Sequence, residues 1–289
     1  MIRLVTDIAN KSLLILSCSY AAILGALCLF QRKLQYFPTA EVPTLDSLPT
    51  AFRRVEEFEV HVIDGLKLKG WLWRQKSSPV LILHLHGNAG NRFHRLYWAN
   101  EIVKRTSCSV ALFDYRGFGG NPGRISEDGL IKDAVAAITW AYTNAKRNSQ
   151  KLVLHLESIG SAVGLSALLK MAVEVRVDGI VVEGGLCSCY DLARSMLPFV
   201  PVKLLLRDKW NLTIQGAQEL DEDINFLSLH GKADRIVPLW CGTKLFEAVS
   251  CRHKKFIAFE FGDHNDLIIQ PGYLDALLEF YAEVERKDT

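Results

Sequence analysis

The sequence predicts an α/β domain, with a mostly parallel central sheet covered by helices on both faces, preceded by a single N-terminal transmembrane helix. Three observations predict it. From residue 80 onward, short and continuously apolar segments alternate with longer segments of helical periodicity, as in parallel sheets that are buried on both faces. An uncharged stretch near the N-terminus is long enough to cross a bilayer. The chain of 289 residues suits one such helix and one domain of about 250 residues.

Residues 12–31 form the candidate anchor. They carry no charged side chain; Lys11 precedes them, and Arg32 and Lys33 follow. A helix of this length spans about 30 Å, the thickness of the hydrocarbon core of a bilayer. A cleaved signal peptide is the alternative, but it would have a shorter apolar region and an A-x-A-like cleavage site, which Ala26-Leu27-Cys28 matches poorly. We therefore expect an uncleaved, single-pass signal-anchor.

The side of the membrane that the domain faces stays open at this point. Arg3 and Lys11 on one flank nearly balance Arg32 and Lys33 on the other, so the positive-inside rule does not discriminate. The glycosylation sequon Asn211-Leu212-Thr213 mildly favours a lumenal domain. In a eukaryote we expect the endoplasmic reticulum or the plasma membrane.

After the anchor, residues 34–54 form an irregular, proline-containing linker, and residues 55–289 form the domain. Alternating patterns at 55–62 and 66–73, joined at Asp64-Gly65, predict an antiparallel hairpin. Further strands are predicted at 80–86, 109–114, 152–157, 179–183, 224–230 and 256–261. Helices are predicted at 93–105, 126–146, 158–173, 241–249 and 266–286.

Residues 186–220 interrupt this alternation. They contain Pro198, Pro201 and Trp210 and an apolar cluster at 196–206. An insertion at this point of the chain can cover the edge of the sheet where the strands end. We expect a small lid over a partly open site; a packed surface excursion without substrate contact is the alternative.

Composition excludes some classes of protein. The 34 basic and 32 acidic residues give a net charge of +2, and no basic motif indicates nucleic-acid binding. The seven cysteines show no zinc-type spacing, since Cys187 and Cys189 stand too close together for a zinc knuckle. We expect mostly free, buried thiols, or a disulfide if the domain faces an oxidising lumen.

Three residues carry the candidate chemistry. Ser158 stands where an apolar strand turns into a small-residue helix, Asp234 follows the strand at 224–230, and His264 follows the strand at 256–261. A serine hydroxyl is a weak nucleophile until an imidazole accepts its proton, and a carboxylate can orient that imidazole. Each residue alone has a structural explanation, as a helix cap, a turn or a surface histidine. Together they predict a catalytic triad.

The loop His86-Gly87-Asn88-Ala89-Gly90-Asn91 follows the first apolar strand. A developing oxyanion needs backbone N–H donors aimed at it. The candidate donors are the amides of Asn88 and Ile159, each of which follows a key residue. Metal ligation by His84 and His86 is the rival interpretation, but no further ligands stand nearby in the sequence. We therefore expect no metal at this site.

These motifs resemble the α/β-hydrolase superfamily, and more narrowly its membrane-anchored α/β-hydrolase-domain-containing branch. The resemblance rests on the motif at 86–91, on Asp-Tyr-Arg-Gly-Phe-Gly at 114–119 and on Gly-Asp-His-Asn-Asp at 262–266. It covers the chain from about residue 34 to the end. It implies the α/β-hydrolase fold and a serine hydrolase that acts on lipid-like esters or acyl thioesters, with Ser158, Asp234 and His264 as the triad and with no cofactor.

One departure from the family pattern concerns the turn around Ser158. The usual motif there is Gly-x-Ser-x-Gly, because neighbouring backbone passes very close, but Leu156 replaces the first glycine. The leucine must either relax the turn or be accommodated by a small neighbour.

The sequence thus predicts a membrane-anchored serine esterase of lipase type, acting on lysophospholipid-like or monoacylglycerol-like substrates. Two alternatives stay open. An acyl-protein thioesterase would use the same triad, although residues 1–11 lack the cysteine cluster of the depalmitoylating members. A catalytically silent membrane scaffold would be favoured by Leu156. Protein partners are not indicated.

Overall fold

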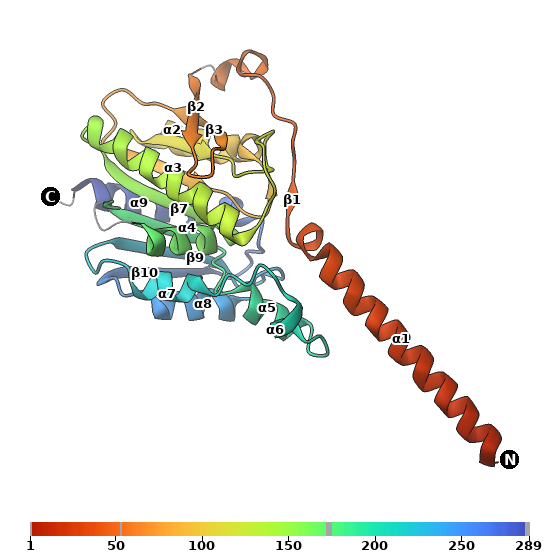
Figure 1. Cartoon of the computed structure of the whole chain (residues 1–289). Helices are drawn as coiled ribbons and strands as arrows, with labels where there is room; N and C mark the ends of the chain where they lie inside the picture. Colours follow the sequence, from red (N-terminus) through yellow and green to blue (C-terminus); the bar gives the residue numbers. More distant parts are fainter. Residues whose placement is uncertain (1, 53, 172–174, 287–289) are drawn as a thin grey trace.

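The computed structural model describes residues 2–52, 54–171 and 175–286 (Figure 1). A long helix, α1 (Ile2–Gln35), projects from a domain built on an eight-stranded sheet. Residue 53 of the predicted linker, the end of the predicted helix at 158–173 and residues 287–289 of the predicted domain lie outside the described residues.

The sheet has the strand order β10-β9-β8-β7-β4-β6-β3-β2. The strands from β10 to β6 run parallel to one another, while β3 is antiparallel to both β6 and β2. This arrangement confirms the predicted parallel sheet and its antiparallel hairpin. The strands are β2 (Val55–His61), β3 (Lys67–Trp73), β4 (Val80–Leu85), β6 (Ser109–Phe113), β7 (Lys151–Glu157), β8 (Gly179–Glu183), β9 (Asn225–Gly231) and β10 (His253–Phe259).

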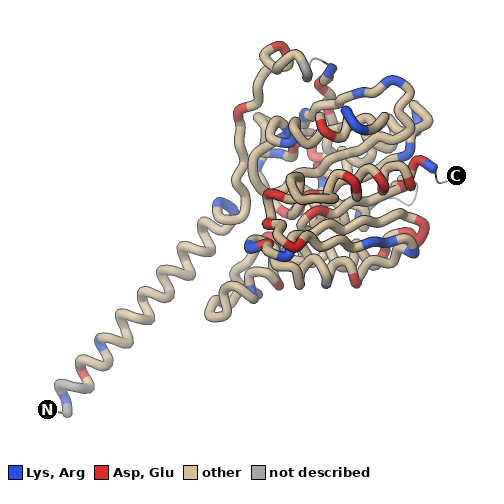
Figure 2. The backbone as a smooth tube through the Cα atoms, turned by 180° about the vertical axis from the view of Figure 1, so that it is seen from behind, with Lys and Arg blue, Asp and Glu red and all other residues tan. Residues whose placement is uncertain are grey.

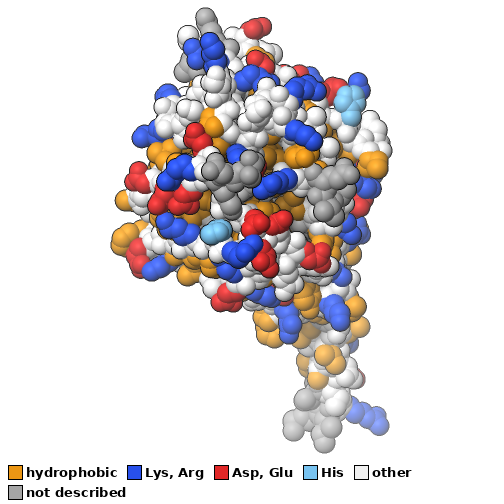
Figure 3. All heavy atoms as spheres, turned by 90° about the vertical axis from the view of Figure 1, so that its left-hand side faces the viewer, with side chains coloured by type: hydrophobic (Ala, Val, Ile, Leu, Met, Phe, Trp, Pro, Cys, Tyr) orange, Lys and Arg blue, Asp and Glu red, His pale blue; other side chains and the backbone are white. Residues whose placement is uncertain are grey.

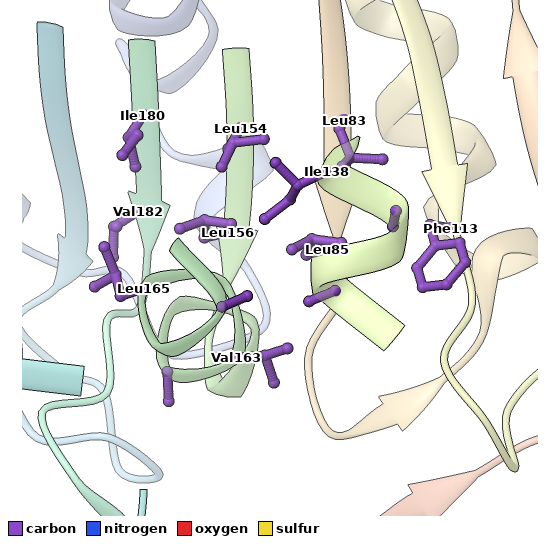
Figure 4. Close-up of a cluster of buried hydrophobic side chains, with 14 of the residues drawn as sticks. Leu83, Leu85, Phe113, Ile138, Leu154, Leu156, Val163, Leu165, Ile180 and Val182 are labelled. Atoms are coloured by element: carbon purple, nitrogen blue, oxygen red, sulfur yellow. The ribbon is translucent and has the colours of Figure 1, made fainter. Parts of the chain in front are cut away.

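Helices cover both faces, as predicted. One face packs against α3 (Glu127–Arg147), α4 (Ile159–Lys170), α7 (Leu212–Gln218) and α8 (Leu239–Ala248). The other packs against α2 (Leu96–Arg105) and α9 (Tyr273–Arg286). Leu83, Leu154 and Ile180 belong to the first apolar cluster (Figure 4), and the intervening Ile82, Val153 and Val181 belong to the second. This alternation explains why the strands read as continuously apolar.

Figure 3 shows the face of the domain that lies away from α1. Lys and Arg side chains are interspersed there with Asp and Glu. This mixed surface agrees with the small net charge of +2.

Two predicted helices differ from the structure. The helix predicted at 266–286 is a 3-10 turn, η4 (Leu267–Ile269), followed by α9, because Pro271 lacks a donor and Gly272 has a φ of +82°. The helix predicted at 93–105 begins as a separate 3-10 turn, η3 (Arg92–Arg95), which the Asn91 side chain caps by accepting from the Phe93 amide.

The N-terminal helix α1 is longer than the predicted apolar stretch. The described residues include one helix segment, Thr6–Gln35, that is long and apolar enough to cross a membrane. Charged residues lie only near the two ends of α1, and the stretch between them carries none (Figure 2). Arg32 and Lys33 fall in its last turn, where cations complement the helix dipole.

The segment after α1 is more ordered than an irregular linker. β1 (Phe37–Pro38) pairs in parallel with β5 (Ala89–Gly90), and two 3-10 turns follow, η1 (Leu45–Ser47) and η2 (Thr50–Phe52). The segment therefore ties the end of α1 to the loop that follows β4.

The insertion at 186–220 contains α5 (Cys189–Met196), α6 (Val202–Leu205) and α7. α7 joins the helical layer of the domain, because Gly216 lets it approach α4: a Cβ there would lie 2.3 Å from the carbonyl oxygen of Leu165. Only α5, α6 and their connections project toward α1 (Figure 1). We call residues 186–211 the lid.

Cys187 and Cys241 form a disulfide, with their Cα atoms 5.2 Å apart. It joins the start of the lid to α8. For this pair the structure has the disulfide that the sequence left open as the alternative to free thiols. The two residues stand 54 positions apart and are brought together by the packing of α8 against the lid.

Candidate active site

Ser158 occupies the sharp turn between β7 and α4. Its backbone φ is +54° and its ψ is −119°, a conformation that non-glycine residues adopt rarely and that is common at functional sites. The turn is crowded on one side, since a Cβ on Gly160 would lie 2.2 Å from the carbonyl oxygen of Leu85. Only glycine fits at 160, and the turn presents the serine at the end of the strand.

Leu156 does not relax this turn. Its side chain lies in the core between β7 and α4 (Figure 4). The space comes from Gly164, one turn into α4: a Cβ there would lie 2.6 Å from Leu156 Cδ2. A small neighbour therefore accommodates the leucine, the second of the two predicted possibilities.

We expect Gly164→Ala to destabilise the domain by about 1–3 kcal/mol, because the new methyl group overlaps the Leu156 side chain. An ordinary glycine-to-alanine change within a helix would stabilise it. Denaturant unfolding measures the difference, and the double variant with Leu156→Ala should cost less than the sum of the single changes. Stability that is unchanged or raised in Gly164→Ala would contradict this account of the turn.

The structure brings Ser158, Asp234 and His264 together. The Ser158 hydroxyl donates to His264 Nε2 over 2.8 Å, and His264 Nδ1–H donates to Asp234 Oδ2 over 2.6 Å. The serine is only 7% exposed. The hydroxyl, imidazole and carboxylate thus form one continuous hydrogen-bonded chain, with the distances that proton transfer requires.

The backbone fixes the Asp234 carboxylate. Its Oδ1 accepts from the amides of Ile236 at 2.9 Å and Val237 at 2.7 Å, which leaves Oδ2 for the imidazole. His230 donates from Nε2 to the Val237 carbonyl over 2.8 Å. Burial lowers the pKa of His230, so it stays neutral and holds the loop without adding charge.

The loop after β4 lies against Ser158. A Cβ on Gly87 would lie 3.4 Å from Ser158 Cβ, so the next amide, that of Asn88, is brought beside the serine. Within the described part of the chain, the amides of Asn88 and Ile159 make no hydrogen bond to protein. Two amides without an acceptor beside a nucleophile are what an oxyanion hole requires.

An ion pair that the sequence did not reveal underlies this loop. Arg95 Nε donates to Glu157 Oε2 over 2.9 Å, and its Nη2 donates to Oε1. Arg95 Nη1 also donates to the Ala89 carbonyl over 2.7 Å. The pair joins the residue before Ser158 to the loop that carries Asn88. No local pattern could have shown it, because the partners stand 62 positions apart.

We expect Glu157→Gln to lower the free energy of unfolding at pH 7 by about 3 kcal/mol, because it leaves the Arg95 guanidinium largely buried and unpaired. Denaturant unfolding measures this loss. Glu260→Gln is a matched control, since it breaks the exposed pair with Lys232 and should cost less than about 1 kcal/mol. Equal effects of the two substitutions would contradict the role of the pair.

The same pair makes stability depend on pH. Burial alone would raise the pKa of Glu157, but the Arg95 guanidinium outweighs it and holds the pKa well below its ordinary value. A depressed carboxyl pKa contributes stability above the unfolded-state pKa of about 4.3, and this contribution is lost as the pH falls below it. Unfolding between pH 7 and pH 3 should therefore show a smaller stability loss in Glu157→Gln than in the wild type.

The two histidines considered as metal ligands have other partners. His84 Nε2 lies 3.6 Å from Glu157 Oε2, and His86 Nε2 lies 3.3 Å from Asp114 Oδ1. Burial, together with the stacked ring of His155, holds the pKa of His84 well below its ordinary value. Across the described residues, no group of three or more His, Cys, Asp or Glu side chains could hold a metal ion.

The segments that follow β4, β9 and β10 expose large apolar side chains. Two follow Asp234, two flank His264 and two follow the Asn88 loop: Ile236, Trp240, Phe261, Ile269, Phe93 and Tyr97. Single exposed hydrophobic residues are ordinary. These six instead lie together in the sequence on three segments, the ones that follow the C-terminal ends of β4, β9 and β10. We call the six residues the apolar rim; exposed apolar surface of this extent is a feature of surfaces that bind apolar partners.

Comparison with known proteins identifies the family, although no family model matches the chain. The chain is 30% identical over 287 residues to the α/β-hydrolase domain-containing protein WAV2 of Arabidopsis thaliana, covering 90% of this chain and 91% of that protein. It is 32% identical over 222 residues to an uncharacterized membrane protein of Saccharomyces cerevisiae, covering 76% and 77%.

Solved structures agree on the fold. An esterase of Pyrococcus furiosus superposes with a TM-score of 0.65 at 16% identity, covering 86% of this chain and 97% of the esterase. The strand order and the turn at Ser158 fit the same architecture. Sequence identity of 30% along nine-tenths of both chains therefore shows that the chain belongs to the α/β-hydrolase domain-containing family.

Proposed function

We propose that the protein is a membrane-tethered serine hydrolase that cleaves carboxylic esters of lipid-like substrates, of lysophospholipid or monoacylglycerol type, through an acyl-enzyme. The hydrogen-bonded chain from Ser158 through His264 to Asp234 carries this proposal. The name of WAV2 and the fold shared with an esterase support a hydrolase.

The chemistry follows from the arrangement. Ser158 Oγ attacks the ester carbonyl while His264 Nε2 takes its proton, and the amides of Asn88 and Ile159 stabilise the oxyanion. His264 then gives the proton to the departing alcohol, leaving the acyl group on Ser158. A water molecule, deprotonated by the same imidazole, attacks the acyl-enzyme; the acid leaves and Ser158 regains its proton.

The substrate class is argued from the surroundings of the site. The apolar rim described above would be costly in water but suits an acyl chain. α1 would hold the domain beside a bilayer, where lipids with one acyl chain partition, and the name of the yeast relative also describes a membrane protein. Tether and rim together favour a lipid-like ester over a water-soluble one.

A side-by-side assay of the purified full-length protein tests the proposal. Its substrates are a monoacylglycerol, a lysophosphatidylcholine and an acyl thioester with the same chain, and the Ser158→Ala variant serves as the blank. We expect turnover of at least one oxygen ester above the blank. Hydrolysis of the thioester alone would replace the esterase by a thioesterase, and no turnover of any substrate by folded protein would favour the silent scaffold.

A further inference from the structure

The anchor helix does not stand apart from the domain. One face of its C-terminal half is partly buried, at positions that recur with helical spacing: Leu24, Leu27, Cys28, Gln31, Arg32 and Gln35. This face packs on the lid. Arg32 makes a two-bond ion pair with the buried Asp208, and Gln31 donates to the Leu205 carbonyl while accepting from the Arg207 amide.

A further contact lies much deeper along the helix. The hydroxyl of Tyr20 donates to the carbonyl of Phe199, at the tip of the lid between α5 and α6. Tyr20 precedes Arg32 by 12 residues, or about 18 Å along the helix axis. If Arg32 and Lys33 mark the headgroup level, the tip of the lid lies well below it, beside the hydrocarbon-spanning part of α1.

The residues at the tip of the lid suit a position at the level of the bilayer's hydrocarbon core. Phe199 is 85% exposed and Leu204 83% exposed, and Met196 and Leu197 are exposed as well. Between residues 192 and 206 the charged side chains are Arg194 and Lys203, both cations with long apolar stems that can reach anionic headgroups. An apolar surface of this kind is stabilised by lipid and is costly in water.

An apolar groove runs between this part of the lid and α1. It encloses about 360 Å³ and is lined mainly by aliphatic side chains, including Leu27, Leu34, Leu192, Ala193, Val200 and Leu205. That volume falls within the range of small-molecule sites in proteins. Gln31 and Gln35 contribute the polar part of the lining, toward the domain end of α1.

The domain end of the groove lies at the candidate oxyanion turn. Gln35 lines the groove, and its carbonyl accepts from the Asn88 side chain over 2.9 Å. The Phe37 amide donates to the Asn88 carbonyl over 2.8 Å. The groove therefore extends from the membrane-facing part of α1 to Gln35, which contacts Asn88, the residue that carries one of the two candidate oxyanion donors.

We propose that the tip of the lid inserts into the bilayer and that the groove between α1 and the lid is the acyl-chain site, through which a lipid chain passes from the membrane to Ser158. This inference rests on the proposed function, because it names the route and the binding site of that substrate. α1 is then a wall of the substrate site as well as a tether.

Filling the groove tests the site. Ala193→Trp places a large side chain in the groove, whereas Ser195→Trp, on the exposed side of the same helix, is the matched control. Both variants and the wild type hydrolyse p-nitrophenyl esters with sixteen-carbon and four-carbon chains in phosphatidylcholine vesicles. We expect the ratio of kcat/KM for the long to the short ester to fall about tenfold or more in Ala193→Trp alone. An unchanged ratio would overturn the proposal.

Cross-linking tests insertion independently of turnover. The full-length protein is reconstituted with a phosphatidylcholine that bears a diazirine on its acyl chain, illuminated and digested. Lipid adducts on residues 196–204 support the proposal, while adducts confined to α1, or cross-links from the lid to a second copy of the chain, overturn it. Fluorophosphonate labelling of the same sample distinguishes failure of this inference from failure of the proposed function. Protein that is labelled by the probe but carries no lipid adducts on the lid contradicts only this inference. Folded protein that the probe does not label contradicts the proposed function.

Discussion

Ser158→Ala should lower kcat for ester hydrolysis by about 10⁴- to 10⁶-fold, which is the scale of loss when a triad nucleophile is removed. The hydroxyl is the atom that His264 Nε2 contacts at 2.8 Å, and the described residues place no other serine hydroxyl on this imidazole. Alanine keeps the turn, since the strained φ of +54° at this position is no harder for it than for serine.

Ser166→Ala is the matched control, because Ser166 is a buried serine on α4 whose hydroxyl has no hydrogen-bond partner among the described residues. It should keep wild-type kcat within a factor of about three, while both variants keep wild-type circular dichroism. A Ser158→Ala enzyme that retains more than about one-hundredth of the wild-type rate would place the nucleophile elsewhere.

Asp234→Asn should lower kcat by about 10⁴-fold with little change in fold. The amides of Ile236 and Val237 donate to Oδ1, so the amide oxygen of asparagine takes that position and its NH₂ group faces the imidazole. An N–H donor facing Nδ1 forces the ring proton onto Nε2, which then cannot accept the proton of Ser158.

Asp263→Asn is the matched control for Asp234→Asn, because Asp263 is the acidic residue directly before His264. Asp263 accepts from the backbone amides of His264 and Arg235, which an asparagine oxygen can also do, so its kcat should stay within about tenfold of the wild type. Comparable losses in the two asparagine variants would show that the loops respond as a whole and that Asp234 has no separate part in orienting the imidazole.

The order of strands and helices was readable from the sequence because both faces of the parallel sheet are covered, so each strand is a short apolar run. The same topology explains why Ser158, Asp234 and His264 could be proposed as a group: each follows a parallel strand, and parallel strands end at one edge of the sheet. Local chain chemistry was sufficient for both.

Features that depend on contacts between residues far apart in the chain could not be predicted from the sequence. The fit of Leu156 against Gly164 depends on how α4 lies on β7, and the Arg95–Glu157 pair crosses two loops. The docking of α1 on the lid joins residues about 180 positions apart, as in the contact of Tyr20 with Phe199. By contrast, Pro271-Gly272 is a local signal for the break before α9. The prediction missed this break because apolar periodicity continues on both sides of it.

The most direct measurement of the central claim is the mass of a covalent adduct. The full-length protein is treated with a fluorophosphonate, digested and sequenced by tandem mass spectrometry. An activated hydroxyl at the end of β7 predicts one phosphonylated site, on Ser158, that disappears when His264 is replaced by alanine. Folded wild-type protein that takes up no probe, or takes it up at another residue, would contradict it.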